Sequence, residues 1–336
     1  MCKHARAQES NAEGRNPPRS GGVYGVEFDG NDRIRGYRPL LTGTTTRNCN
    51  GGATYWGTWI SCEEIIRGQC YQVDPKGVQP PQVTVMGGPE GGFFEAFAYD
   101  DRNRTSPEFF VTEDIEDGAV RRYRPSGDAV AAFPDGGWEL LHREGGTIDY
   151  LEFLPGSGDG GGTFRWTSSH QAGKDSALQH YQQVEGVLRH ENNLIFVSKA
   201  EKKVYVLDLD RGTYADFSTK SQGKDLPGGG SFGDGPDQLT YSPTDGLVYF
   251  TEDGGRGPGI FAYDGKSYRA VLEASDVDTY KGDETTGWAM SPSGMSMIFA
   301  LQDVGHLFQV RRIDGLPFSG SNSIEWNDSL RRRRSW

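Results

Sequence analysis

The sequence predicts an all-β protein, and three observations lead to this prediction. Short segments of alternating apolar and polar residues recur along most of the chain, which is the pattern of half-buried strands. Clusters of Gly, Asp, Asn and Pro separate these segments, and Gly accounts for 48 of the 336 residues, about twice its ordinary share of ~7%. The chain also carries 17 Phe, 15 Tyr and 7 Trp, which favour strands over helices. We find no convincing amphipathic helix of three or more turns.

Four segments repeat one order of strands and turns. Each begins with an acidic or polar residue, followed by a short apolar strand, a tight turn and a second apolar strand. These segments are 91–125, 181–210, 236–265 and 286–312. Glu185, Asp237 and Thr286 follow one another at steps of roughly 50 residues, and a period of ~40–50 residues with several strands in each repeat is typical of a β-propeller. With the strands near the beginning of the chain included, we expect five or six blades.

The length of the chain is sufficient for one large domain with its own core. We expect a single propeller domain over residues 21–315, preceded by a polar, disordered lead-in at 1–20 and followed by a tail at 316–336 that ends in RRRRSW. The lead-in has no apolar stretch of the kind found in a secretory signal. No apolar run approaches the ~20 residues of a membrane span, so we expect none.

The composition argues against a nucleic-acid-binding protein. The formal net charge is -12, with 35 Lys and Arg against 47 Asp and Glu, whereas nucleic-acid binders carry a basic surface. The four cysteines are Cys2, Cys49, Cys62 and Cys70, too few for a disulfide scaffold, although a Cys62–Cys70 bridge could form. No CxxC spacing occurs, which argues against a structural zinc site.

The acidic residues that open the repeats predict a metal site. In a propeller the first strand of each blade lines the central channel, so Glu95, Glu185, Asp237 and Thr286 would converge at one mouth of that channel. Carboxylates that lie close together repel one another unless a cation neutralises them. Oxygen ligands suit a hard metal ion.

The densest segment of the sequence is Arg47–Glu64, RNCNGGATYWGTWISCEE. A hairpin with a core Trp and a buried Cys would account for most of it. The adjacent acids Glu63 and Glu64 fit that interpretation least well, because two neighbouring carboxylates cost free energy without a counter-charge.

This segment resembles the signature of the PhoX-type alkaline phosphatases. Four further motifs resemble that family in the same order along the chain, and together with the signature they extend over most of residues 21–312. The further motifs are GGFFEAFAYD with the later FVTEDIEDGAVRRYR, YQQVEGV, PDQLTYSP and TGWAMSPSG. The resemblance implies a propeller phosphatase that hydrolyses phosphate esters at a site holding iron and calcium ions. It also implies an exported protein, although no leader is visible.

The resemblance also implies roles for individual residues. It implies that Cys49 is a thiolate ligand of iron, and that Glu95 and Glu185 are ligands that bridge or flank the metals. Weaker candidates, most plausibly for calcium, are Glu63, Glu64 and Asp237. Thiolate suits iron and carboxylate oxygen suits calcium.

The chain departs from the family pattern at the position expected to hold phosphate. Gln183 stands where the family commonly has Arg, and Val184 stands where it has Pro. A neutral amide does not replace a guanidinium that binds an anion with two hydrogen bonds. Phe94 stands in place of a common His, and Tyr55 in place of a Pro.

Two other functions stay open. A calcium-dependent lactonase-type hydrolase would need the carboxylates but not Cys49, and a non-catalytic binding propeller would hold metals only for stability. Among weaker motifs, Gly229–Gly233 fits GxSxG without the strand-to-helix context of a serine hydrolase. We expect Arg121, Arg122 and Arg124 on a solvated outer strand, where a contact with phosphate is the alternative.

Overall fold

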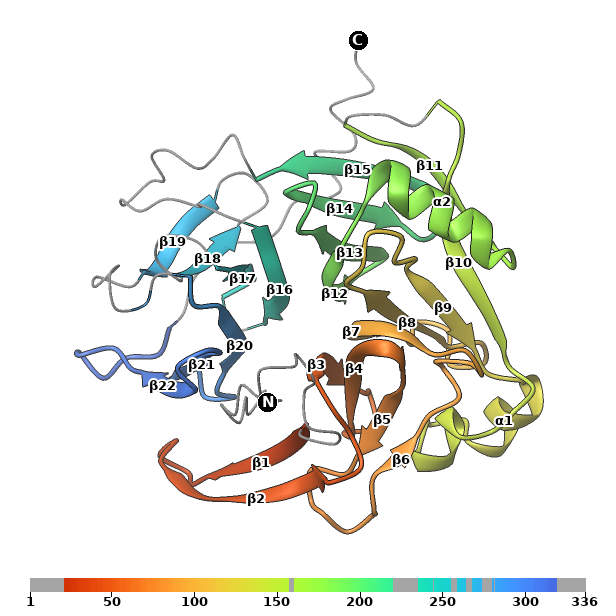
Figure 1. Ribbon diagram of the computed structural model, residues 1–336. Helices are drawn as coiled ribbons and strands as arrows, with labels where there is room; N and C mark the ends of the chain where they lie inside the picture. The colour runs from red at the N-terminus through yellow and green to blue at the C-terminus, as the bar shows by residue number, and fades with distance from the viewer. Residues whose placement is uncertain are drawn as a thin grey trace, which may run out of the picture. The chain divides into compact units, whose positions relative to one another are not determined.

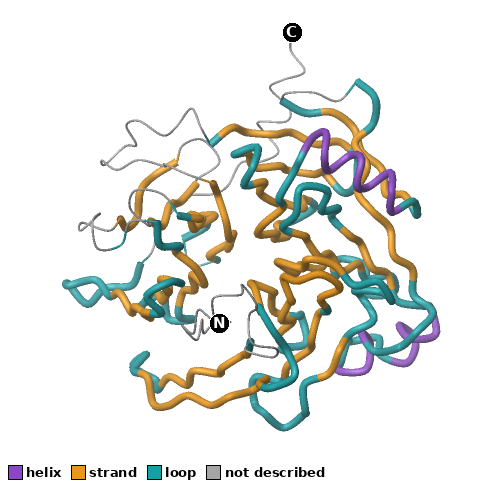
Figure 2. Tube along the Cα trace, in the orientation of Figure 1, coloured by secondary structure: helices purple, strands orange, loops and turns teal. Residues whose placement is uncertain are grey.

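The computed structural model describes residues 21–156, 160–219, 235–243, 245–254, 259–263, 268–273, 280 and 282–318. Most of these residues lie in strands, and the all-β propeller fold class is confirmed (Figures 1 and 2). The number of blades stays a prediction. The predicted lead-in, the GxSxG segment and nearly all of the basic tail lie outside the described residues. Within the described ranges, none of the helices has the length and hydropathy needed to cross a membrane.

The chain divides into two compact units. The first comprises residues 1–154 and 164–189, and the second comprises residues 155–163 and 190–336. The single propeller domain expected from the sequence stays a prediction, and each unit is described separately below.

The first unit begins with an isolated hairpin and continues as a succession of antiparallel strands. Its strands are β1 (Gly22–Phe28), β2 (Ile34–Thr42), β3 (Asn48–Ala53), β4 (Trp59–Gly68), β5 (Cys70–Val73), β6 (Gln82–Val83), β7 (Gly92–Asp100), β8 (Glu108–Glu113), β9 (Arg121–Arg124), β10 (Thr147–Phe153), β11 (Gly162–Thr167) and β12 (Val184–His190). Strands β3 to β6 pair in sequence order, as do β7 to β11. Strand β7 also pairs with β3 and β4, which joins the two series.

Aromatic and aliphatic side chains fill the core of this unit. Strands β7 and β8 are buried along almost their whole length, which explains their nearly continuous apolar sequences. The core cluster consists of Ile60, Cys62, Cys70, Met86, Phe94, Phe97, Phe109, Val111, Tyr123, Ala129, Val130, Leu140 and Leu141.

Helices occupy two of the connections, and the sequence analysis did not find them. They are α1 (Gly127–Ala132), the 3₁₀-helix η1 (Trp138–Leu141) and α2 (His170–His180). Helix α2 has eleven residues and begins at Ser169, whose side chain accepts a hydrogen bond from the Ala172 amide. Its sequence, HQAGKDSALQH, contains few apolar residues, and its buried positions are the small residues Gly173, Ser176 and Ala177. A face of small residues gives little apolar periodicity, which is why the pattern did not predict this helix.

The second unit contains the antiparallel series β13 to β15, a four-stranded antiparallel sheet and a three-stranded antiparallel sheet, and sheets of this size are typical of propeller blades. Their strands are β13 (Asn193–Ser198), β14 (Lys203–Asp208) and β15 (Thr213–Ser218); β16 (Gly235–Ser242), β17 (Leu247–Asp253), β18 (Gly259–Tyr263) and β19 (Tyr268–Glu273); and β20 (Thr285–Met290), β21 (Met297–Leu301) and β22 (His306–Val310). Tyr249 stacks on Trp288 with ring centroids 4.0 Å apart, which joins β17 to β20 in this unit's core.

The expectation of a solvated outer strand at Arg121–Arg124 is wrong. This segment is β9, which pairs with β8 on one side and β10 on the other. Arg121 is 3% exposed and its Nε donates to Glu113 at 2.6 Å, while its other nitrogens donate to the carbonyls of Gly87 and Gly91. Burial raises the pKa of Glu113, and Arg121 counteracts that rise. The guanidinium therefore supports the fold and is not available to a phosphate.

The arginines that follow are also paired within the sheet. Arg122 donates to Glu108 at 2.9 Å and to Asp149 at 2.7 Å. Arg124 donates to the same oxygen of Asp149 at 2.8 Å. These pairs join β8, β9 and β10 and account for the charges that the sequence places on β9.

Candidate metal centre

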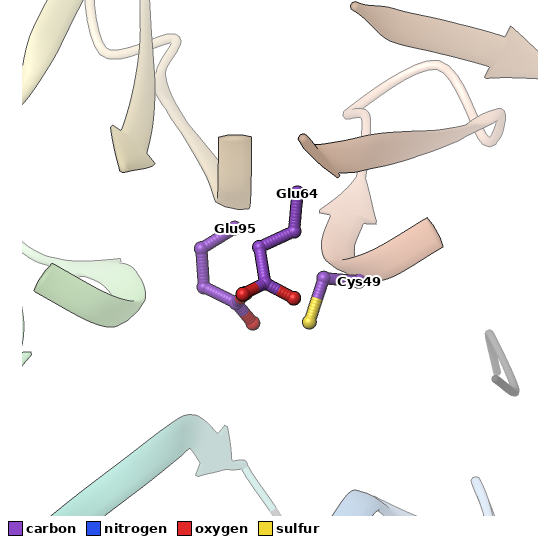
Figure 3. A group of neighbouring side chains, drawn as sticks. All are labelled: Cys49, Glu64 and Glu95. Atoms are coloured by element: carbon purple, nitrogen blue, oxygen red, sulfur yellow. The ribbon is translucent and has the colours of Figure 1, made fainter. Parts of the chain in front are cut away.

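Strand pairing brings a thiol and two carboxylates together in the first unit. Residue Gly51 of β3 pairs with Ala96 of β7, and Glu64 of β4 pairs with Phe93 of β7. Cys49 lies two residues before Gly51, and Glu95 directly precedes Ala96. These strand pairings therefore bring both residues close to Glu64. One ligand atom from each of the three side chains lies within 4.8 Å of the other two. Figure 3 shows the sulfur and the carboxylates pointing toward one another.

Glu95 is the most deeply buried member of this group. It is 1% exposed, and its Oε1 atom has no hydrogen-bond partner in the described part of the chain. Burial raises the pKa of Glu95 well above its usual range, and the nearby carboxylates of Glu185 and Glu64 raise it further. A hydrogen bond with Cys49 acts in the opposite direction. An unpaired, buried oxygen among acidic neighbours is the environment that a cation would stabilise.

Glu95 lies in a β-bulge. Phe94 pairs with Glu113 and Phe97 pairs with Val111, so Glu95 and Ala96 together face the single residue Thr112. A bulge of this kind turns side chains away from the regular alternation of a strand. It explains how β7 directs the Glu95 carboxylate toward Cys49 and Glu64 although the residues on either side of Glu95 are buried core residues.

Thr112 holds this bulge in place and connects it to β12. The Ala96 amide donates to its hydroxyl oxygen at 3.0 Å, and the same hydroxyl donates to the backbone carbonyl of Glu185 at 2.7 Å. Thr112 is fully buried. It therefore links the strand that carries Glu95 to the strand that carries Glu185, which is itself 3% exposed.

A second bulge lies beside Cys49. Cys49 pairs with Cys62 and Gly52 pairs with Ile60, which leaves Asn50 and Gly51 opposite one residue of β4. Gly51 has φ +80°, and a Cβ atom there would lie 1.9 Å from the Ile60 carbonyl oxygen. The Gly-Gly pair of the motif is thus required by the backbone next to the thiol.

Glu63 and Glu64 point to different surroundings, as neighbours on a strand do. The carboxylate of Glu63 accepts hydrogen bonds from the Thr45 hydroxyl and from the amides of Thr46 and Gln69. It fixes the segment before β3 and the segment after β4, which lie at the same end of this antiparallel pair, and the structure does not bring it to the group around Cys49. Glu64 joins that group, and Arg47 lies 3.6 Å from its carboxylate. The sequence analysis assigned no role to Arg47, and only its position next to the motif could have indicated one.

Gln183 precedes β12 in a left-handed conformation, with φ +51°. Its amide donates to the Ile115 carbonyl at 3.2 Å, and its side chain is partly exposed. It directly precedes β12, two residues before Glu185.

Asp237 belongs to the second unit, where the same local arrangement recurs. Pro236 pairs with Glu252 and Leu239 pairs with Phe250, so Asp237 and Gln238 face Thr251. The Gln238 amide donates to the Thr251 hydroxyl at 2.9 Å, and that hydroxyl lies 3.1 Å from the Asp237 carboxylate. Asp237 is 2% exposed. The Thr-Glu-Asp repeat at 112–114 and 251–253 therefore marks the strand opposite an acidic bulge.

The donor set of the first unit fits the metals that the resemblance implies. One thiol and several carboxylate oxygens combine a soft ligand for iron with hard ligands for calcium. The fit rests on the unpaired Oε1 atom of Glu95 and on the short distances within the group of Cys49, Glu64 and Glu95.

A known protein family matches the segment that carries these residues. The sequence model of the family described as alkaline phosphatase PhoX matches residues 31–125, which include Cys49, Glu64 and Glu95. No curated protein sequence matches the chain.

Several solved structures match this chain at low sequence identity, and a PhoX structure with a TM-score of 0.60 shares its fold. The structure described as Pseudomonas fluorescens PhoX in complex with vanadate, a transition state analogue, is 15% identical, with a TM-score of 0.60, and the match covers 83% of this chain and 71% of that one. A nidogen/laminin complex is 9% identical, with a TM-score of 0.47 over 89% and 93% of the two chains. A Myxococcus xanthus glutaminyl cyclase is 13% identical, with a TM-score of 0.41 over 80% and 91%. The last two likenesses are too distant to bear on function.

The position of the matched segment and the shared fold lead to the same conclusion. The chain resembles the PhoX alkaline phosphatases in sequence over residues 31–125 and in the fold of its strands.

Proposed function

We propose that this protein is a metal-dependent phosphatase that hydrolyses phosphate monoesters, with iron and calcium as its metals. The observation that carries the proposal is the group formed by Cys49, Glu64 and Glu95, whose ligand atoms lie within 4.8 Å of one another. The match of the PhoX family to this segment and the likeness to a PhoX structure with vanadate support it.

The proposal assigns roles to the thiol and the carboxylates. Cys49 would hold iron, and Glu95 and Glu185 would serve as further ligands of the metals. Glu64 supplies a further oxygen ligand for calcium, and Glu63 and Asp237 remain weaker candidates for that ion. Bound metals would neutralise the phosphate and activate an oxygen nucleophile.

The chain's own residues prepare the site for that chemistry. Thr112 sets the relation of β7 to β12, and the burial of Glu95 keeps water away from its carboxylate. Burial and the neighbouring carboxylates raise the pKa of Glu95 in the absence of a cation, and metal binding would favour its deprotonated carboxylate. Gln183 and Arg47 are the candidates for contact with the substrate phosphate; Arg47 has 42% of its side chain exposed and lies beside Glu64.

The test combines metal analysis with turnover. Purified protein is analysed for iron and calcium and assayed with para-nitrophenyl phosphate with and without added calcium. We expect both metals and calcium-dependent turnover, and we expect Cys49→Ala to lose iron and activity together. Glu152→Gln is the matched control, because Glu152 pairs with Arg165 on the surface, where 61% of the arginine side chain is exposed.

Other outcomes would favour the alternatives. Calcium without iron, together with full activity of Cys49→Ala on a lactone, would favour the lactonase-type hydrolase. Metal content without turnover or phosphate affinity would favour a binding propeller, to which the neutral Gln183 is better suited.

A further inference from the structure

Three cysteines of the first unit lie in a row across three neighbouring strands. Cys49 of β3 pairs with Cys62 of β4, and Cys62 pairs in turn with Cys70 of β5. Residues directly opposite in antiparallel strands have Cα atoms ~4.5–5.5 Å apart, which lies within the range that a disulfide requires. The backbone therefore brings Cys62 within bridging distance of two different cysteines.

The side chains distinguish the two pairings. The sulfurs of Cys62 and Cys70 lie 3.4 Å apart, and both residues are fully buried in the core cluster with Ile60 and Phe94. The sulfur of Cys49 lies instead with the carboxylates of Glu64 and Glu95. To reach Cys62, it would have to turn away from that group.

We propose that Cys62 and Cys70 form a disulfide when the protein reacts with a low-molecular-weight disulfide such as oxidised glutathione. We further propose that this bond protects the metal ligand, because it occupies the one cysteine that lies opposite Cys49. The first statement depends on the cysteines alone. The second rests on the proposed function of Cys49.

The reaction is a thiol–disulfide exchange in two steps. The thiolate of one cysteine attacks a sulfur of oxidised glutathione, which breaks the glutathione S–S bond and releases one glutathione thiol. The second protein thiolate attacks the mixed disulfide and releases the other glutathione thiol. The protein loses two protons and two electrons, and glutathione disulfide gains them. Because both sulfurs are buried, we expect the exchange during folding or during local opening of the β4–β5 pair.

The test is disulfide mapping of the full chain. The reduced, unfolded protein is refolded in glutathione buffers of increasing oxidised fraction, and the folded protein is incubated with oxidised glutathione in parallel. Free thiols are blocked, and peptides are identified by mass spectrometry without reduction. We expect a Cys62–Cys70 peptide that has lost two hydrogen atoms, together with blocked Cys49. If that peptide is absent in both treatments, or if Cys49–Cys62 predominates, the proposal is overturned.

The protective role is tested with a matched pair of variants. Under oxidising conditions Cys70→Ser leaves Cys62 opposite Cys49, so we expect a Cys49–Cys62 disulfide and loss of bound iron. Cys62→Ser removes the shared partner, so iron should be retained. Equal iron retention in the two variants would contradict protection. Absence of iron from the wild type would contradict the proposed function instead, and the mapping result would stand by itself.

Discussion

The hydroxyl of Thr112 donates a hydrogen bond to the backbone carbonyl of Glu185 at 2.7 Å, although 73 positions separate the two residues in the sequence. The same hydroxyl accepts a hydrogen bond from the amide of Ala96, which directly follows Glu95. One buried side chain thus determines how the strands bearing two candidate metal ligands lie against each other.

Replacing Thr112 should weaken the site more than the fold. Thr112→Val keeps the shape but leaves the Ala96 amide and the Glu185 carbonyl without this partner, which costs about 1–3 kcal/mol of stability. We expect a loss of metal affinity in addition, because β7 and β12 are no longer held in register. Thr112→Ser should restore both properties. Urea unfolding and metal titration of the stripped protein measure the two effects.

Thr84→Val is the control for this prediction. The Thr84 hydroxyl donates to the Cys70 carbonyl at 3.0 Å and is also buried, but this hydrogen bond joins the segment after β6 to β5 and not the strands that carry Glu95 and Glu185. It should lose stability with unchanged metal affinity. A parallel loss of affinity in both variants would contradict a specific role for Thr112.

The metal-free protein should lose stability as the pH rises, through Glu95. The pKa of Glu95 is raised above 4.5 in the folded state, so above that pH the unfolded chain releases the proton first. The contribution of this group is full at lower pH and declines as the pH rises toward the folded pKa. Urea unfolding of stripped protein at a series of pH values should therefore give a steeper decline for wild type than for Glu95→Gln. Parallel curves for the two proteins would show that Glu95 does not titrate in this way.

The buried pair of Arg121 and Glu113 should be essential for stability. Arg121→Met leaves the Glu113 carboxylate buried without its partner, which costs about 3–5 kcal/mol. Arg121→Lys should recover only part of this, because an ammonium does not reproduce the fork that reaches Glu113, Gly87 and Gly91. Arg165→Met removes the exposed pair with Glu152 and should change stability far less, because solvent screens that pair. Equal midpoints of denaturant unfolding for the Arg121 and Arg165 variants would refute this account.

Gly51 and Gly57 should respond differently to the same substitution. Both have positive φ, at +80° and +87°, so alanine strains the backbone at either position by about 1–2 kcal/mol. At Gly51 the added Cβ would also collide with the Ile60 carbonyl, whereas nothing lies within 4 Å at Gly57. We expect Gly51→Ala to lose metal binding and much more stability than Gly57→Ala. Similar unfolding free energies would show that the bulge beside Cys49 can relax.

The sequence was sufficient to predict the fold class because that depends on local patterns, and the family resemblance supplied candidate ligands whose role stays a prediction. Strand alternation, Gly-rich turns and repeated acidic residues can be read directly from the amino-acid sequence. Cys49, Glu64 and Glu95 were all predicted, and the structure brings them together. The sequence could not show which of the two adjacent acids belongs to this group. Glu63 and Glu64 looked equivalent, and only the structure shows that Glu63 instead accepts hydrogen bonds from Thr45, Thr46 and Gln69.

Other features depend on contacts between distant segments. Arg121 appeared to lie on an outer strand because β9 is short and charged, and its burial follows from pairing on both sides by β8 and β10. Helix α2 packs through small residues that leave no apolar stripe. The bulges that contain Glu95 and Asp237 require knowledge of which residues face each other across strands.

The recurrence of the threonine opposite these two bulges makes the arrangement recognisable in other chains. In both cases the acidic residue directly precedes the residue whose backbone amide donates a hydrogen bond to the threonine hydroxyl. That threonine begins a Thr-Glu-Asp triplet on the following strand. An acidic residue near the start of one strand and such a triplet at the end of the next form a two-part signature. That signature would identify buried carboxylates in homologous sequences that are too divergent for the Cys-x-Gly-Gly segment to be aligned.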